Sequence, residues 1–480
     1  MNNFDLVIRN GRIATPADVF SADLGIAGGR ITAIAAELPG GQEEIDAAGR
    51  TITPGGIDGH IHLEQRLPDG AEICDDFFTG SRSAACGGTT TIIPFAFQEQ
   101  GASVREALAA YRESAEGRCF VDYAFHAIIT DPTAQVLNQE LPALVRQGYT
   151  SYKLYMTYRG LQLTDRQVLD LLCALRREQA MAMVHAENAE FVEWLTERLV
   201  DEGLTSPKDH TRAHPVIGER EAVHRAMSMS ELVGAPIVLV HVSAREVIEQ
   251  IDWARRKGLA IYAETCPQYL VLTEDDYDEH GFEGAKLICT PPPRTADDQQ
   301  AVWQALARDA LDLVSSDHSP FRFADPKGKQ IAGTSAGFHK VPNGVPGVET
   351  RLPLLYSEGV LKGRIDLNQF VRLSATNTAK LYGLYPRKGT IAIGSDADLV
   401  IWNEDSPVTV TNAMLHHACD YTPYEGMRLA AWPAVTLCRG RPVYRDGALC
   451  GEAGHGAFQA CERPLAARVP PPSRISELLS

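Results

Sequence analysis

Six side chains of the types that bind metal ions or react at carbonyl groups stand in, or at the ends of, short apolar segments. They are His60, His62, Lys153, His185, His241 and Asp317. Side chains alternate along a strand, so Asp58, His60 and His62 would share one face. A single histidine at such a position is more often packed or hydrogen-bonded than a ligand. Four of the 14 histidines at matching positions are harder to explain by chance, and imidazole and carboxylate suit zinc and similar divalent metals.

Lys153 is out of place in such a group, because an ammonium ion is repelled by divalent cations. One interpretation is ordinary: the side chain snorkels, or pairs with an acid such as Glu187. In the other, carbon dioxide adds to the neutral amine and forms a carbamate, an anion with two oxygens. Two metals about 3.5–4 Å apart need such a shared anion to offset their repulsion. The spacing of the residues does not choose between the two.

Eight short apolar or β-branched segments would carry these side chains. They cover residues 51–62, 89–97, 119–129, 149–156, 180–187, 236–243, 260–267 and 311–319. Helical patterns, such as residues 104–117, lie between most of them. The alternation predicts a (β/α)8 barrel, the TIM-barrel fold of the α/β class, whose strands all end at one mouth. An open doubly wound sheet is the alternative, although no glycine-rich dinucleotide fingerprint follows the first strand.

The two ends of the chain resemble each other in pattern. Both contain short alternating segments separated by turn pairs such as Asn10-Gly11 and Asp446-Gly447. We therefore predict one small β-sandwich domain built from both termini, with the barrel inserted between its halves. The predicted parts are the β-sandwich of residues 1–54 and 385–460, the (β/α)8 barrel of residues 55–384, and an extended tail of residues 461–480. The tail contains three consecutive prolines, and we expect it to be free or to clasp a neighbouring subunit.

Composition narrows the possible partners. The 480 residues are 44% hydrophobic and 22% charged, which is ordinary for a globular protein. With 45 basic and 62 acidic residues the net charge is −17, so we expect neither nucleic acid nor a membrane surface as a partner. No apolar run is long enough for a span, and we expect no secretion signal. The ten cysteines form no CxxC pair, which indicates free thiols in a reducing cytoplasm.

The motifs that contain the six residues resemble those of the amidohydrolase superfamily, and more narrowly the cyclic amidohydrolases of the hydantoinase and dihydropyrimidinase group. The motifs are His60-x-His62, YTSYKLYMTY around Lys153, VHAEN with His185, VHVS with His241, and SSDHSPF with Asp317. The resemblance runs from about residue 4 to 460. It implies a homotetramer or homodimer and two divalent ions, usually Zn²⁺. One ion would be held by His60, His62, carboxylated Lys153 and Asp317, and the other by Lys153, His185 and His241.

The resemblance also implies a reaction. Metal-derived hydroxide attacks the amide carbon of a small cyclic amide, and Asp317 acts as general base and then acid. Tyr158 would hydrogen-bond the scissile carbonyl oxygen, while backbone groups at Thr290 and Asn343 meet the ring. The ordinary alternatives are a rim aromatic for Tyr158 and simple turn formation for Thr290 and Asn343. The products from 5,6-dihydropyrimidines or 5-substituted hydantoins would be N-carbamoyl amino acids.

The sequence leaves the substrate open. Dihydroorotase and allantoinase types usually carry an arginine where this chain has Glu64, so we expect Glu64 to repel anionic substrates and favour neutral rings. The run ETRLPLL is closer to allantoinase-like relatives, so an allantoinase is an alternative. A non-catalytic scaffold related to dihydropyrimidinase and a mononuclear deaminase are two further alternatives. We expect a substituent pocket of Leu63, Phe95, Tyr155 and Gln162, and Arg66 as a solvated rim charge.

The remaining candidates are assigned ordinary places. We expect His126 in the barrel core, His318 pointing away from Asp317, and His416 and His417 at the surface or an interface. Cys266 and Cys289 are expected to be small buried apolar groups.

Overall fold

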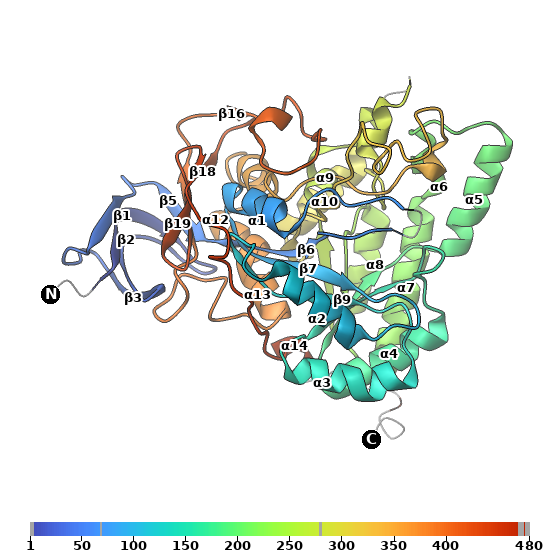
Figure 1. The fold of residues 1–480 in the computed structure, drawn as a ribbon, viewed down its shortest axis with the longest axis horizontal. Coiled ribbons are helices and arrows are strands. Elements are labelled where there is room, and N and C mark those ends of the chain that lie inside the picture. Colours follow the sequence, from blue (N-terminus) through green and yellow to red (C-terminus); the bar gives the residue numbers. More distant parts are fainter. Residues whose placement is uncertain (1–3, 68–69, 278–280, 469–474, 476–480) are drawn as a thin grey trace.

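The structure is a computed structural model that describes residues 4–67, 70–277, 281–468 and 475. Within these residues the chain forms a barrel of parallel strands ringed by helices, and beside it a mixed sheet that contains both ends of the chain (Figure 1). None of the helices in the described ranges is long and apolar enough to cross a membrane.

The barrel strands follow one another around the sheet in chain order. They are β6 (Gly56–Ile61), β7 (Thr89–Phe97), β9 (His126–Ile128), β10 (Ser151–Tyr155), β11 (Met181–His185), β12 (Ile237–Leu239), β13 (Ile261–Thr265) and β14 (Leu313–Val314), and the short β8 (Asp122–Tyr123) also pairs with β7. The cylinder closes where Ile61 pairs in parallel with His318, and the His62 amide donates to the His318 carbonyl over 2.8 Å. This closure confirms the predicted (β/α)8 barrel and excludes the open sheet.

Helices cover the outside of the barrel (Figure 1). The longer ones are α1 (Phe77–Cys86), α2 (Val104–Ala115), α3 (Leu141–Arg146), α4 (Asp165–Glu178), α5 (Ala189–Asp201), α7 (Val216–Val233), α8 (Arg245–Arg256) and α10 (Ala296–Ala307). Shorter helices are α6 (Asp209–Ala213), α9 (Pro267–Val271), α11 (Arg351–Leu354), α12 (Leu367–Val371), α13 (Asn377–Leu381) and α14 (Leu465–Arg468).

Helix α4 illustrates why these segments are helical. Thr164 and Gln167 form a reciprocal capping box at its start, which satisfies backbone donors that have no partner within the helix. Val168, Leu171, Leu172, Ala174 and Leu175 are buried at intervals of one to three residues along one stripe, as packing on a sheet requires. The helix ends at Glu178, and the capping residue Gln179 adopts a left-handed conformation with φ of 58°.

The second sheet joins the two ends of the chain. Its strands run in the order β20 (Ala448–Leu449), β19 (Arg441–Arg445), β18 (Trp432–Cys438), β15 (Leu399–Asn403), β5 (Thr51–Pro54), β1 (Leu6–Ala14), β2 (Val19–Ala27) and β3 (Arg30–Ala35), with β4 (Glu43–Asp46) also beside β1. The antiparallel pair β5–β15 connects the two halves. One core contains apolar side chains from both ends, including Ile8, Leu24, Leu399 and Leu437. A separate hairpin pairs β16 (Val408–Thr409) with β17 (Arg428–Leu429).

The first predicted barrel segment is divided between the two sheets. Residues Thr51–Pro54 form β5 of the terminal sheet, and the barrel begins only with β6. The chain crosses over at Gly55, where an added Cβ would lie 2.2 Å from Thr90 Oγ1. A glycine is therefore required where the chain passes closely over β7.

A buried ion cluster lies where the terminal sheet meets the barrel. Lys388 Nζ lies 2.7 Å from Asp122 of β8, 3.1 Å from Asp396 and 2.6 Å from Asp398. The lysine side chain has no exposed surface, and it is the ion-pair partner of Asp398, while Asp122 also pairs with Arg439 and Asp396 with Arg30.

The expectation of an extended tail from residue 461 is wrong for residues 461–468. The Cys461 amide donates to the Gly148 carbonyl over 3.0 Å, and Arg463 Nε donates to the Glu178 carbonyl over 2.9 Å. Residues Leu465–Arg468 then form α14, which packs against α13. Two buried side chains, Cys461 and Ala467, explain the docking, because each removes apolar surface from water. The remainder of the tail, apart from residue 475, lies outside the described residues.

Candidate metal centre and active site

The barrel brings two of the predicted histidines and the aspartate together at its mouth. Asp317 Oδ1 lies 3.1 Å from His60 Nε2 and 3.6 Å from His62 Nε2. The ligand atoms of these three residues all lie within 4.8 Å of one another. Lys153, on β10, places Nζ 3.3 Å from His60 Nε2. Residues from three strand ends therefore meet at one point, as expected for parallel strands of a barrel.

The other two histidines form an adjacent pair. His185 Nδ1, at the end of β11, lies 2.8 Å from His241 Nε2, which follows β12. The ring centroids of His241 and His60 are 5.7 Å apart, so the pair adjoins the first group. All six predicted residues line one cavity of about 360 Å³. The structure thus brings together every residue of the predicted metal site.

Burial sets the protonation of this group. It lowers the pKa of His60, His185 and His241, which keeps these imidazoles neutral, the form that binds metals. Burial also lowers the pKa of Lys153, so a larger share of its amine is neutral. Burial acts to raise the pKa of Asp317, but the neighbouring His60 and His62 hold it at about 2. The site therefore presents neutral imidazoles, a carboxylate and a destabilised ammonium.

This donor set fits divalent cations. Lys153 has no carboxylate within ion-pair distance among the residues that the structure describes, and it lies 5.3 Å from the ring centres of Phe95 and Tyr155. The ordinary pairing with Glu187 does not occur, because Glu187 binds His185 Nε2 at 3.1 Å and His214 Nδ1 at 3.0 Å. Four imidazoles and a carboxylate are suitable ligands as they stand. The Lys153 ammonium cannot bind a cation. Lys153 could be a ligand only if its amine were converted to an anion such as a carbamate.

Three polar residues that the sequence analysis did not assign to the site hold the candidate ligands in orientation. Glu264, on β13, places Oε1 2.6 Å from His60 Nδ1. Gln65 Oε1 lies 2.8 Å from His62 Nδ1, and Glu187 contacts His185 as described. Such contacts fix the orientation of each imidazole ring and determine which of its nitrogens carries the proton. Glu264 stands in the apolar segment of strand seven, so a buried carboxylate in a predicted barrel strand was the signal that could have found it.

The backbone is strained at several of these positions. His241, Asp317 and Tyr158 adopt left-handed conformations with φ of 43°, 48° and 71°. Residues other than glycine rarely adopt such conformations outside turns, and they concentrate at functional sites. All three residues line the cavity at the mouth.

The predicted substrate-contacting residues lie in the same cavity. Tyr158, Thr290 and Asn343 all line it. Burial raises the pKa of Tyr158 well above its ordinary value, which keeps the phenol protonated. Much of the remaining wall is apolar, with Leu67, Ile73, Phe97, Ile128, Leu161 and Phe321.

The predicted substituent pocket is correct only for Tyr155, which lines the cavity. Leu63 is buried and packs toward Gly80 of α1. Phe95 lies behind the ligands, with ring centres 4.9 Å from His60 and 5.0 Å from His62. Gln162 forms a backbone bridge to Tyr155 beside the cavity. These residues were misplaced because strand alternation does not give the depth of a side chain in the barrel.

The expectation that Glu64 repels anionic substrates is wrong. Glu64 has a φ of 50°, and its carboxylate accepts hydrogen bonds from Ser114 and Arg118 on the α2 side. It is therefore neutralised and does not line the cavity. Arg66 is exposed and lies 3.8 Å from Glu72, which agrees with a solvated rim charge.

Two of the other histidines have the ordinary places expected of them. His126 is bonded to the Gly59 carbonyl over 3.0 Å inside the barrel. His318 points away from Asp317 and binds Asp75 at 3.0 Å.

The other two histidines were expected at the surface or an interface. His416 and His417 are half-buried, and His416 Nδ1 lies 2.8 Å from Glu349. Buried polar groups on neighbouring elements draw them inward.

The cysteines near the strand ends are also as expected. Cys266 and Cys289 are buried, and burial raises the pKa of both thiols. Neither is therefore a nucleophile at neutral pH.

A closed (β/α)8 barrel with four imidazoles, a lysine and an aspartate at its mouth defines a class of metal-dependent hydrolases. Comparison with known proteins agrees: the model described as "Amidohydrolase family" matches residues 51–443. The chain belongs to the amidohydrolase family.

Within this family the chain is in the hydantoinase and dihydropyrimidinase group. It is 41% identical to a D-hydantoinase of Rhizobium radiobacter over 95% of this chain and 98% of that protein. It is 38% identical to a D-phenylhydantoinase of Escherichia coli O1:K1 / APEC, over 94% and 97% of the two chains. The structure of dihydropyrimidinase from Brevibacillus agri NCHU1002 aligns with a TM-score of 0.92 at 39% identity, over 95% and 98% of the two chains.

Proposed function

We propose that this chain hydrolyses the ring amide of 5,6-dihydropyrimidines and 5-substituted hydantoins and releases N-carbamoyl amino acids. The observation that carries this proposal is the meeting of six ligand-type side chains at one end of a cavity that Tyr158, Thr290 and Asn343 also line. The hydantoinases and dihydropyrimidinases to which the chain is similar along nearly its whole length support the same reaction class.

Two divalent ions, which we propose to be Zn²⁺, fit the ligand set. His60, His62 and Asp317 would hold one ion, His185 and His241 the other, and Lys153, carboxylated on Nζ, would contribute to both. Bound ions of this kind supply hydroxide at neutral pH by lowering the pKa of water. The lowered pKa of Lys153 supports the carbamate, because only the neutral amine adds carbon dioxide.

The chain's own residues would then direct the reaction. Asp317 takes the proton of the attacking water and passes it to the leaving ring nitrogen. Its pKa of about 2 keeps the carboxylate ionised at neutral pH, which is the form that can accept a proton. Tyr158 donates from its phenol to the carbonyl oxygen as negative charge develops there. Backbone groups at Thr290 and Asn343 would orient the ring between these residues.

The cavity wall favours an apolar substituent at the ring. Leu67, Ile73, Phe97, Leu161 and Phe321 offer contacts that a hydrocarbon or aromatic group satisfies. The ureido group of allantoin would leave several hydrogen-bonding groups facing this wall, so an allantoinase is the weaker candidate. Retention of all six ligand types argues against a non-catalytic scaffold.

Metal analysis and a substrate screen test the proposal together. We expect about two metal ions per chain, two being the number in a binuclear hydrolase site. We expect ring opening of dihydrouracil, dihydrothymine, hydantoin and phenylhydantoin, with little turnover of dihydroorotate. Metal-free protein after loading would support the scaffold. Turnover of allantoin alone, or ammonia release without ring opening, would assign the chain to an allantoinase or a deaminase.

We also propose that the enzyme is a cytoplasmic homo-oligomer. An exposed apolar patch supports association: Trp194 is 57% exposed on α5, and Ile217 is 48% exposed at the start of α7. Phe191, also exposed, lies 3.9 Å from the Cβ position of Gly218 and connects the two helices. Ten free cysteines support a reducing compartment. Light scattering should give a dimer or tetramer, and a monomer at micromolar concentration would contradict association.

A further inference from the structure

A buried lysine lies behind the wall of the substrate cavity. Lys329 stands on the loop that follows β14 and is 1% exposed. Its Nζ donates to two backbone carbonyls, that of Ile288 over 2.8 Å and that of Pro342 over 2.7 Å. Burial lowers the pKa of Lys329 to about 7. The ammonium ion has three N–H groups and the neutral amine has two, so both forms can supply the two bonds.

The two carbonyls belong to the two loops that carry the proposed contacts with the substrate ring. Ile288 stands two residues before Thr290, and Pro342 directly precedes Asn343. Thr290 and Asn343 both line the cavity. Lys329 therefore joins two loops that reach the cavity from separate parts of the chain.

The backbone groups at the ends of these loops complement a ring amide. Within the described part of the chain, neither the Thr290 carbonyl nor the Asn343 N–H forms a hydrogen bond. A –CO–NH–CO– ring whose scissile carbonyl is held by Tyr158 has an N–H and a second carbonyl left, and these two groups match the Thr290 carbonyl and the Asn343 N–H. A hydrogen bond to a carbonyl polarises its whole peptide unit, so the bond from Lys329 to Pro342 makes the Asn343 N–H a stronger donor.

We propose that Lys329 is a positioning residue for the ring amide of the substrate. It holds the loops of Thr290 and Asn343 at a fixed separation, and it polarises the peptide between Pro342 and Asn343. Lys329 is not among the residues that line the cavity, and its Nζ lies 5.9 Å from the ring centre of Phe321, which does line it. The lysine thus acts through backbone groups, and its role in ring binding rests on the proposed function.

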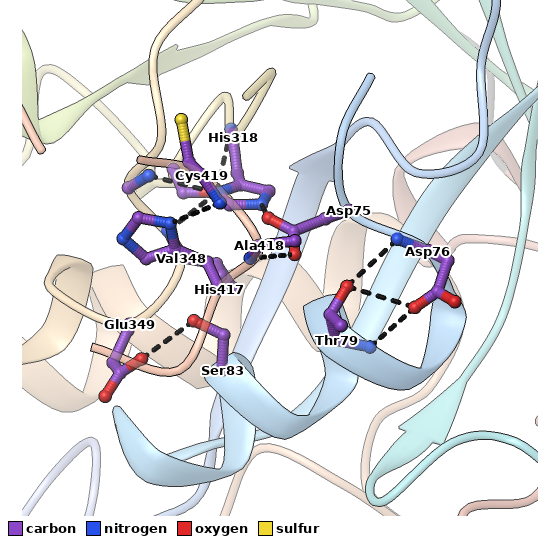
Figure 2. A network of polar contacts seen from close by, with 12 residues as sticks. Asp75, Asp76, Thr79, Ser83, His318, Val348, Glu349, His417, Ala418 and Cys419 are labelled. Carbon is purple, nitrogen blue, oxygen red and sulfur yellow. Dashed lines mark hydrogen bonds and ion pairs between the residues drawn. The ribbon is translucent and has the colours of Figure 1, made fainter. Parts of the chain in front are cut away.

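The segment that carries the general base is held by other contacts. His318, which follows Asp317, binds Asp75 at 3.0 Å (Figure 2), and its Nδ1 accepts from the Gly347 amide over 3.0 Å. Neither contact involves Lys329. Loss of the Lys329 bonds should therefore weaken ring binding without moving Asp317, which raises the KM and leaves kcat near the wild-type value.

Steady-state kinetics of Lys329→Met test this separation, because methionine removes both bonds and keeps a long, buried side chain. In the metal-loaded enzyme the KM for hydantoin and dihydrouracil should rise about fivefold, the value of about one hydrogen bond, with kcat within about twofold. Lys327→Met, on the same loop, replaces an exposed lysine and should leave the KM unchanged. An unchanged KM in folded Lys329→Met, or a joint fall of kcat and metal content, would overturn the proposal.

Thermal unfolding establishes that each variant is folded. Lys329→Gln takes the place of Lys329→Met if the latter does not fold. Glutamine is polar, as the surroundings of the two carbonyls require, but it is one atom too short to reach both of them. The same changes in KM and kcat are expected.

A second substrate tests the polarisation of the peptide before Asn343. In 2-thiohydantoin, sulfur replaces the carbonyl oxygen that we assign to the Asn343 N–H, and sulfur accepts a hydrogen bond less well. Lys329→Met should reduce the preference for hydantoin over 2-thiohydantoin, measured as kcat/KM, by about twofold or more, because both changes act on one bond. An identical preference in the two enzymes would overturn this effect of Lys329.

Hydrogen exchange tests the joining of the loops without any turnover. The Gly344 amide donates to the Ile288 carbonyl over 3.0 Å, beside the Lys329 bond to the same carbonyl. It should exchange about fivefold faster in Lys329→Met than in the wild type or Lys327→Met. Equal exchange in all three would overturn the proposal. If the wild type opens neither hydantoin nor dihydrouracil, the proposed function fails, and the exchange rates still decide whether Lys329 joins the loops.

Discussion

Replacement of Glu264 by glutamine tests whether the residues behind the ligands organise the metal centre. Glu264 Oε1 lies 2.6 Å from His60 Nδ1, and both side chains are almost completely buried. Glutamine keeps the size of the side chain and its carbonyl oxygen can still accept from Nδ1–H. The substitution therefore removes the negative charge while it preserves the ring orientation and the tautomer of His60.

The expected loss follows from this contact. Removal of a carboxylate that supports a ligating histidine typically reduces metal affinity about 10–100-fold, which is about 1.4–2.8 kcal/mol. Burial raises the pKa of Glu264, which favours its protonated form. When a cation binds His60 Nε2, the proton between the two side chains must lie on His60 Nδ1, and Glu264 is then negatively charged. The wild-type affinity should therefore fall as the pH decreases, because protonated Glu264 gives no charge. The Glu264→Gln variant should lose this part of the pH dependence.

Zn²⁺ titration of the chelator-treated protein against a competing indicator measures both effects. Glu249→Gln, on the exposed face of α8, is the matched control and should bind metal as the wild type does. Circular dichroism and thermal unfolding verify that the variants are folded. If Glu264→Gln bound Zn²⁺ within twofold of the control, with the same pH dependence, the argument that Glu264 supports His60 would be refuted.

Four further substitutions test the proposed site and the junction of the two sheets. Asp317→Asn should retain metal but lose about 10²–10⁴-fold in kcat, the usual contribution of a general base, and a kcat near the wild-type value would reject that role. Lys153→Ala should lose metal and turnover, with partial rescue by short carboxylic acids; full metal occupancy without rescue would contradict the carbamate. Tyr158→Phe should lower kcat about 10²–10³-fold with little change in KM, whereas a change confined to KM would assign Tyr158 to binding alone. Lys388→Met should reduce the free energy of unfolding by about 3–5 kcal/mol, because Asp398 loses its ion-pair partner and Asp122 and Asp396 each lose one of two. Burial raises the pKa of Asp398, and a raised folded-state pKa favours the protonated form, so this loss should be smaller at acidic than at neutral pH. Urea denaturation measures the effect, and an equal loss in the exposed Lys362→Met control would refute the explanation.

The barrel and the six candidate ligands could be predicted from the sequence for a simple geometric reason. Strands of parallel barrels are short and apolar, and their carboxyl ends all lie at one mouth. His185 and His241 need only follow successive strands to become neighbours, and the structure puts their ring nitrogens 2.8 Å apart. Lys153 could be recognised because a cation in that group is chemically out of place.

The residues around the ligands were harder to predict, because local pattern does not determine where a loop or a side chain turns. A φ of 50° sends the Glu64 carboxylate to Arg118, although its position in the sequence suggested the substrate side. Phe95 packs against the rings of His60 and His62 and does not line the cavity. Each outcome depends on a partner that is distant in sequence.

The sequence by itself thus determined the order of strands and helices and the chemical types at the strand ends, since both follow from periodicity and side-chain chemistry over a few residues. Only the tertiary structure decided that Glu264 supports His60 and that residues 461–468 dock on the barrel. These contacts join segments tens to hundreds of residues apart. They exist because burial in a shared core leaves each polar group only the partners that packing brings within reach.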